Sequence, residues 1–105
     1  MVWRRQSGRM TDLDRIIHEP ARLQIMALLA AVKEADFLYL LKETALTKGN
    51  LSSHLGKLEE TGYVEIEKTF RGKIPLTMVR LSPKGKAAFQ EYRKALNGLL
   101  RDRDH

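Results

Sequence analysis

The chain has 105 residues, 43% of them hydrophobic, so it can bury one core but not two. Cysteine is absent, which excludes disulfides, zinc ribbons, thiolate metal sensing and cysteine nucleophiles. A formal net charge of +6 suits a polyanionic partner, although a solvated basic surface would give the same total. Because no apolar run approaches roughly 18 residues and no secretory signal pattern is present, we expect a soluble cytoplasmic protein.

The N-terminal part is predicted to contain a tail and a short helix. We expect residues 1–10 to form a flexible basic tail, because Trp3 stands among arginines and a glycine without any periodicity. Residues 11–18 show the helical spacing of apolar side chains and are predicted to form an amphipathic helix. Its apolar side carries Leu13, Ile16 and Ile17.

Two further helices are predicted next. The first runs from Pro20 to about Val32, because proline suits a first-turn position and apolar residues cover most of the circumference, as in a core helix. The second covers residues 37–43 and can be capped by Asp36. Its inward-facing residues are predicted to be Leu38 and Leu41.

A fourth helix is predicted between a cap at Thr47 and a stop at Gly62, and its two faces differ. The buried stripe is Leu51, Leu55 and Leu58. The opposite face carries small or hydrogen-bonding residues: Gly49, Asn50, Ser53, Gly56 and Lys57, with Ser52 and His54 at its flanks. Such a face lets a helix approach the floor of the DNA major groove, where Asn50 can bond adenine edges and Lys57 a guanine or a phosphate. An ordinary solvated face is the alternative.

After Gly62, alternating apolar and polar residues over 63–68 and 77–81 predict two antiparallel strands. The segment between them can turn at Gly72 and display Arg71 and Lys73, the geometry of a phosphate or minor-groove contact. A charged edge that only prevents sheet aggregation is the alternative. Six basic residues fill the interval between Glu67 and Glu91, which contains no acidic residue: Lys68, Arg71, Lys73, Arg80, Lys84 and Lys86.

The last helix is predicted over residues 83–101, after a cap by Ser82. Its apolar residues recur at alternating spacings of three and four, as in a coiled-coil seam. A helix of about 19 residues is about 28 Å long and should overhang so small a body, so we expect the seam to form a twofold dimer rather than only to cover the chain's own core. The predicted dimer residues are Leu13, Ile16, Ile17, Phe89, Tyr92, Leu96 and Leu99.

Three segments resemble short bacterial and archaeal winged helix regulators related to the MarR and ArsR families. They are residues 18–29 (HEPARLQIMALL), 46–64 (LTKGNLSSHLGKLEETGYV) and 81–85 (LSPKG), similar to the second helix, the recognition helix with the first strand, and the join after the wing. The resemblance spans about residues 13–100 and implies a winged helix-turn-helix fold of the α+β, mainly α, class. We therefore expect one DNA-binding domain over residues 11–101, which includes the dimerisation helix over 83–101. The resemblance also implies a homodimeric transcriptional regulator that binds double-stranded DNA at a pseudo-palindromic operator.

By the same resemblance, DNA contacts would come from Lys48, Asn50, Ser52, Ser53, His54 and Lys57 of the helix and from Arg71 and Lys73 of the wing. Arg22 is expected to be a structural pairing partner instead of a DNA contact. No effector is inferred, because the chain lacks much of the C-terminal part beside which MarR-type members bind small phenolic ligands.

Other functions fit the sequence less well. An enzyme is not expected, because no glycine-rich phosphate loop, carboxylate pair or serine-histidine-acid set has a suitable spacing. No metal or other cofactor is expected, since His18, His54 and His105 lie far apart on different elements. The main alternative is a winged helix docking module in a transcription complex, which should expose apolar residues on the fourth helix. Single-strand binding by stacking is disfavoured, because only Tyr63 and Phe70 lie near the basic region.

Overall fold

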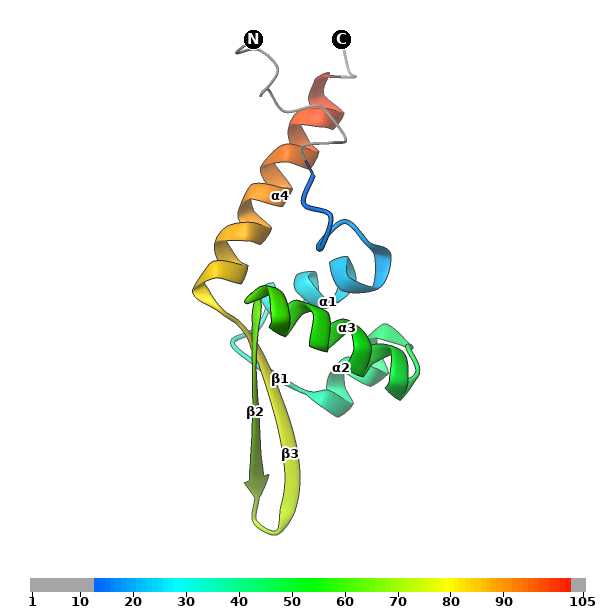
Figure 1. Ribbon diagram of the computed structural model, residues 1–105, viewed down its shortest axis with the longest axis vertical. Helices are drawn as coiled ribbons and strands as arrows, with labels where there is room; N and C mark the ends of the chain where they lie inside the picture. Colours follow the sequence, from blue (N-terminus) through cyan, green and yellow to red (C-terminus); the bar gives the residue numbers. More distant parts are fainter. Residues whose placement is uncertain (1–12, 103–105) are drawn as a thin grey trace.

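The computed structural model describes residues 13–102, which fold into four helices and one antiparallel sheet of three strands (Figure 1). In chain order the elements are α1 (Pro20–Ala30), β1 (Ala35–Asp36), α2 (Phe37–Thr44), α3 (Lys48–Thr61), β2 (Val64–Arg71), β3 (Ile74–Leu81) and α4 (Pro83–Asp102). The predicted class, mainly helical with a hairpin and a long last helix, is confirmed. The tail predicted over residues 1–10 lies outside the described residues.

The helix ends follow local signals in the sequence. Asp36 and Thr47 each accept a hydrogen bond from the backbone N–H three residues later, at 2.8 and 3.1 Å, and so cap α2 and α3. Pro20 occupies the first turn of α1, which ends at Ala30, slightly earlier than predicted. Gly62 ends α3 with a φ of 91°, a left-handed conformation that favours glycine.

The helix predicted over residues 11–18 is wrong for the part that the structure describes, which forms a turn. Asp14 Oδ1 accepts hydrogen bonds from Ile16 N and Ile17 N, and His18 N donates to Asp14 O at 2.7 Å, so a single turn closes. Glu19 is then extended, with φ −143° and ψ 130°. The reason is the following proline, which disfavours helical backbone in the residue before it.

α2 buries a different row of residues from the predicted one. Leu40 is fully buried and Leu41 is half-buried, whereas Leu38 is 65% exposed, so the prediction for Leu38 is wrong. The buried row continues one turn later at Thr44, whose hydroxyl donates to Leu40 O at 2.7 Å and is thereby satisfied. In a helix of two turns with several adjacent apolar residues, spacing alone does not decide which face turns inward.

The sheet has the strand order β1-β3-β2. β2 and β3 pair along their whole lengths, so Gly72 and Lys73 alone form the hairpin turn. Gly72 has a φ of 64°, as the first central residue of a type II′ turn requires. Both strands are longer than predicted. The two-residue strand β1, which pairs with β3 at Met78 and Val79, was not predicted because so short a segment shows no alternation.

The core lies where α1, α2 and α3 meet the nearer half of the hairpin. Its fully buried side chains include Ile25, Met26, Leu40, Leu51, Leu58 and Val79. The hairpin projects from this core in one direction and α4 in the other, which gives the molecule an elongated shape of 57 × 25 × 21 Å (Figure 1). Within residues 13–102 no helix is long and apolar enough to cross a membrane.

Candidate nucleic-acid interface

α3 has the two faces that its spacing predicts. The stripe of Leu51, Leu55 and Leu58 is at most 3% exposed and packs in the core. The exposed residues of the other side include Lys48, Gly49, Asn50, Ser52, Ser53, Gly56 and Lys57. The first turn of α3 contains no acidic residue, so no side-chain charge offsets the positive end of the helix dipole there. The helix can therefore meet phosphates at its start and base edges along its exposed face.

His54 lies apart from this open face, because its ring is bonded to α1. Arg22 Nη1 is 3.2 Å from His54 Nδ1, and since arginine has no acceptor, Nδ1 accepts this hydrogen bond. Arg22 Nε also donates to Ile16 O at 2.6 Å, and Glu19 Oε1 lies 3.9 Å from His54 Nδ1. Arg22 is thus the structural partner that the sequence predicts, and His54 links α3 to α1.

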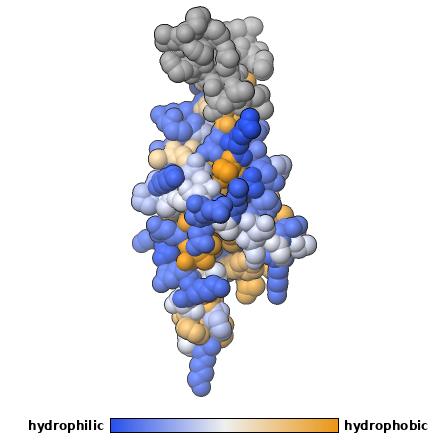
Figure 2. All heavy atoms as spheres, in the orientation of Figure 1, coloured by the Kyte–Doolittle hydropathy of each residue, from blue (hydrophilic) through white to orange (hydrophobic). Residues whose placement is uncertain are grey.

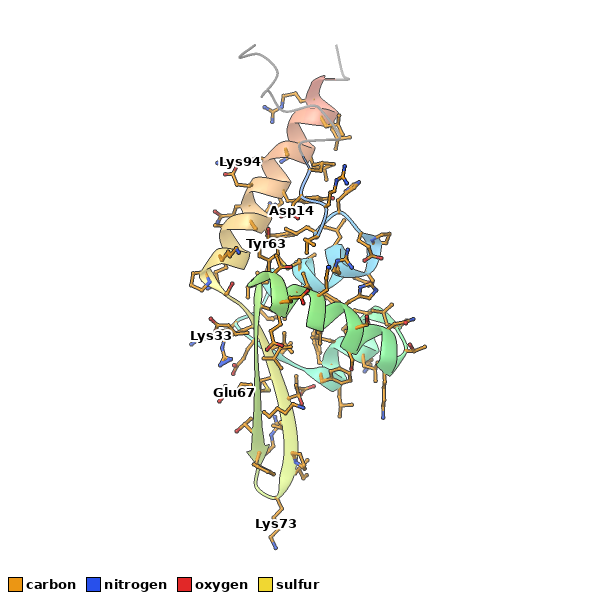
Figure 3. The ribbon with its side chains drawn as sticks, in the orientation of Figure 1. Asp14, Lys33, Tyr63, Glu67, Lys73 and Lys94 are labelled. Carbon is orange, nitrogen blue, oxygen red and sulfur yellow. The ribbon has the colours of Figure 1, made fainter. Side chains whose placement is uncertain are left out.

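The six basic residues between Glu67 and Glu91 differ in their surroundings. Some form hydrogen bonds or ion pairs within the fold, and others are exposed on the hairpin. Arg80 pairs with Glu67 at 2.7 Å and lies 3.9 Å from Glu65. Lys84 Nζ donates to Thr61 O at 2.8 Å and satisfies a carbonyl at the end of α3. The exposed cations of the hairpin are Lys68, Arg71 and Lys73. Figure 3 shows Lys73 pointing beyond the end of the hairpin, away from the helices.

α3 and the hairpin border a shared hollow of about 470 Å³. The helix contributes Ser52, Gly56 and Glu59 to its walls, and the hairpin contributes Lys68 and Thr77. The open face of α3 and one face of the hairpin therefore look onto the same space. Lys68 was not among the predicted contact residues, although strand alternation places it on the same face as the buried end of β2. A nucleic-acid backbone between the two elements would pass this residue.

A set of hydrogen bonds fixes the hairpin and α4 against the end of α3. Ser82 N donates to Tyr63 O at 3.0 Å, and Ser82 Oγ donates to Gly62 O at 2.5 Å. Gly85 N in turn donates to Ser82 Oγ at 2.9 Å, so Ser82 also caps α4 as predicted. A Cβ at Gly85 would stand 2.0 Å from Tyr63 O, which leaves no room for any other residue. Residues 81–85 are thus the joint that holds the wing beside α3.

Tyr63 connects the same joint to the turn before α1. Its hydroxyl donates to Asp14 Oδ2 at 2.5 Å, and Figure 3 shows the two labelled side chains close together. Burial, followed by this hydrogen bond and the charge of Asp14, raises the pKa of Tyr63 to about 12. A second link joins His18 Nδ1 to Tyr92 Oη at 2.7 Å, and burial raises the pKa of Tyr92. Both tyrosines therefore stay neutral near pH 7.

The predicted dimer residues are mostly covered within one chain. Those at most 9% exposed are Leu13, Ile17, Phe89, Tyr92 and Leu99. The expectation that a single copy leaves these five uncovered is therefore wrong. Four of them, Leu13, Ile17, Phe89 and Tyr92, belong to the chain's own core, and His18 of the turn before α1 bonds Tyr92 of α4. Ile16 and Leu96 are half-buried, and Leu100, which was not predicted, is 56% exposed. The exposed apolar surface of α4 lies nearer its end than predicted, and the assignment of the seam to a dimer stays a prediction.

A helix with a buried leucine stripe and a polar outer face, joined to a two-stranded hairpin with a basic tip, is the arrangement of a winged helix protein. The chain belongs to the winged helix DNA-binding domain family, which it matches over residues 21–100. This is a family of DNA-binding domains and not of enzymes. The predicted family is thereby confirmed at the level of winged helix transcriptional regulators.

Known proteins are similar to the chain over most of its length. An uncharacterised protein from Methanocaldococcus jannaschii is 39% identical over 79 residues, which cover 74% of this chain and 85% of that protein. The structure of a transcriptional regulator homologue from Pyrococcus horikoshii has a TM-score of 0.82 and 30% identity, and the match covers 88% of this chain and 91% of that chain. For Rv0081 from M. tuberculosis, the TM-score is 0.73 and the identity 26%, over 87% and 88% of the two chains.

Proposed function

We propose that the chain is a sequence-specific transcriptional regulator that binds duplex DNA as a homodimer at an inverted-repeat operator. α3 enters the major groove in this proposal, and the wing, residues 64–81, lies along the neighbouring backbone and minor groove. The proposed base-reading residues are Asn50 and Ser53, and the proposed phosphate contacts are Lys48, Ser52, Lys57, Arg71 and Lys73, of which Lys57 can also bond a guanine. His54 acts indirectly, by holding α3 on α1.

The observation that carries the proposal is the exposed polar face of α3 beside the basic wing and their shared hollow. A docking module would present large apolar side chains on α3, where partners could bury them. Within α3 every leucine is buried. The exposed face opposite the leucine stripe, from Lys48 to Lys57, consists of glycine, asparagine, serine and lysine. A face of this composition suits base edges and phosphates better than an apolar partner.

Selection of bound sequences from a random duplex pool tests sequence-specific binding directly. A twofold dimer that reads successive major grooves should enrich an inverted repeat whose half-sites lie about 10 base pairs apart, centre to centre. A docking module would enrich no sequence at all. Enrichment of a single half-site without its repeat would contradict the dimer while leaving specific binding in place.

Asn50→Ala and Lys73→Ala should separate base reading from backbone contact. Asn50 lies on the exposed face of α3, so its loss should weaken binding to the selected site by about 1 to 3 kcal/mol and leave random DNA nearly unaffected. Lys73 lies at the hairpin turn, so its loss should weaken both alike. Titrations of labelled selected and random duplexes measure the two effects. Equal losses for Asn50→Ala on both duplexes would show that α3 does not read bases through this residue.

The dimer part of the proposal rests on the far end of α4. The 20 residues of this helix span about 30 Å, and its end extends well past the helical body (Figure 1). Leu96 and Leu100 stand one turn apart there, the first half-buried and the second 56% exposed. Two copies that pack these ends together would bury the leucines and place both α3 helices on one side of the assembly.

Sedimentation should show a species of twice 12.1 kDa for the unmutated protein at tens of micromolar. Leu100→Lys should convert it to the monomer, because the new charge would be buried in the contact. Glu91→Lys is a matched control, since residue 91 is exposed on the opposite side of the same helix, and it should leave the dimer intact. A monomer in the unmutated protein, unchanged on dilution, would remove the dimer and its inverted repeat from the proposal.

A further inference from the structure

The tip of the wing carries two large apolar side chains that contribute nothing to the core. Phe70 is 67% exposed and Ile74 is 64% exposed, beside the exposed cations Arg71 and Lys73. Figure 2 shows apolar and charged side chains mixed at the far end of the hairpin. Phosphate contacts account for the cations at the tip, but a phenyl ring forms no hydrogen bond or ion pair with a phosphate. The exposure of Phe70 therefore requires another explanation.

The hairpin register assigns the two apolar side chains to opposite faces. Phe70 is paired with Pro75, and the pair two residues closer to the core along each strand is Lys68 with Thr77. Side chains two residues apart share a face, so Phe70 and Pro75 extend the face that borders the hollow beside α3. Ile74 is paired with Arg71 and belongs to the other face.

The backbone around Phe70 is also conformationally restricted. In a hairpin with a two-residue turn, the residues next to the turn exchange hydrogen bonds, so the next pair, Phe70 and Pro75, does not. Pro75 therefore breaks no bond to β2, and its ring lies directly across from Phe70, where side chains of such a pair approach most closely. A fixed proline φ and a tight turn at Gly72 keep this end of the hairpin in one conformation.

We propose that Phe70, braced by Pro75, is a wedge that enters the minor groove beside the α3 site, inserts between two base pairs and kinks the duplex. Apolar side chains inserted in this way unstack a base step, and the bend they cause brings more phosphate backbone to the protein. Arg71 and Lys73 neutralise phosphates on either side of the opened step. The inserted step should be a pyrimidine–purine step, because these unstack most easily.

This inference rests on the proposed duplex binding, and its test uses separate readouts for the two. The probe is a selected duplex of about 30 base pairs with fluorophores at its ends and 2-aminopurine at a central TA step. Binding of the full chain should shorten the end-to-end distance, consistent with a bend of about 20–90°, and raise 2-aminopurine fluorescence as the step unstacks. The binding isotherm itself reports the proposed function.

Phe70→Ala should abolish both the bend and the fluorescence rise while affinity falls by about tenfold or less, because the cations still hold the backbone. Phe70→Leu, which keeps an apolar wedge, should restore both signals in part. Ile74→Ala is the matched control: it removes an equally exposed apolar side chain from the opposite face and should bend DNA as the unmutated protein does. Phe70 and Ile74 are both exposed, so unchanged thermal unfolding checks that the three variants fold.

Three outcomes would overturn the wedge. The unmutated protein could bind the duplex without bending or unstacking it, Phe70→Ala could bend it normally, or Ile74→Ala could lose the bend equally. In each of these the isotherm still records duplex binding, so the proposed function survives. Absence of binding by the unmutated protein to any duplex would instead remove both the proposed function and the wedge.

Discussion

Gly85→Ala should lower the free energy of unfolding by about 3 kcal/mol or more, the largest stability effect that we expect from a single added methyl group. The added Cβ would stand 2.0 Å from the backbone oxygen of Tyr63 and 2.8 Å from its carbonyl carbon. Neither atom belongs to a flexible side chain, so relief requires α4 to move away from the joint. Urea unfolding followed by circular dichroism measures the change in free energy.

Two other helical glycines provide matched controls for this substitution. A Cβ at Gly49 or Gly56 meets nothing within 4 Å, so alanine there should raise stability by up to about 1 kcal/mol through helix propensity. Opposite signs for Gly85→Ala and for the α3 variants would locate the effect in the joint. A stability of Gly85→Ala equal to that of the unmutated protein would mean that α4 and Tyr63 do not approach as closely as the structure has them.

Raising the salt concentration from 50 to 200 mM should weaken duplex binding by about 10⁴-fold if two copies bind together. The cations proposed to meet phosphates in each copy are Lys48, Lys57, Arg71 and Lys73. Each neutralised phosphate releases counterions and contributes about −0.9 to the slope of log K against log salt. Fluorescence anisotropy titrations over a salt series give this slope, and a slope near zero would contradict phosphate-based binding.

The same titration distinguishes one bound copy from two. Four contacts predict a slope of about −3.6, whereas eight contacts from a dimer predict a slope of about −7. Lys73→Ala should reduce the magnitude by about one unit in the first case and by about two in the second. The half-buried Arg80 is a control, because it already pairs with Glu67 and should contribute little to the slope.

Signals confined to a few neighbouring residues predicted the fold best. Thr47, Asp36, Ser82 and Gly62 each act on backbone groups within a few positions, so their helix ends could be identified without knowledge of the tertiary structure. The features that were missed or predicted wrongly depend on contacts between distant parts of the chain. β1 exists only because β3 lies beside it. Leu38 is exposed because the packing of α2 selected the face that carries Leu40.

In the candidate site, too, features set by local sequence could be predicted, whereas those set by contacts between distant residues could not. The exposed face of α3 could be predicted, because burying the leucine stripe forces the opposite residues outward. The hydrogen bond between His54 and Arg22 could not be predicted, because the two residues are 32 positions apart and meet only when α3 packs on α1. The role of Lys68 beside the hollow likewise depends on which face of the hairpin turns toward α3.

The joint after the wing also limits how DNA binding can be controlled. Ser82 is the single residue between β3 and α4, and its hydroxyl and amide bind the carbonyls of Gly62 and Tyr63 at the end of α3. α3, the wing and the base of α4 should therefore move together as one rigid unit, which carries both of the proposed DNA-contacting parts. In the proposed dimer, a signal that tilts the far end of α4 would rotate this whole unit, so regulation would change the distance between the α3 helices of the two copies and leave the shape of each unit unchanged.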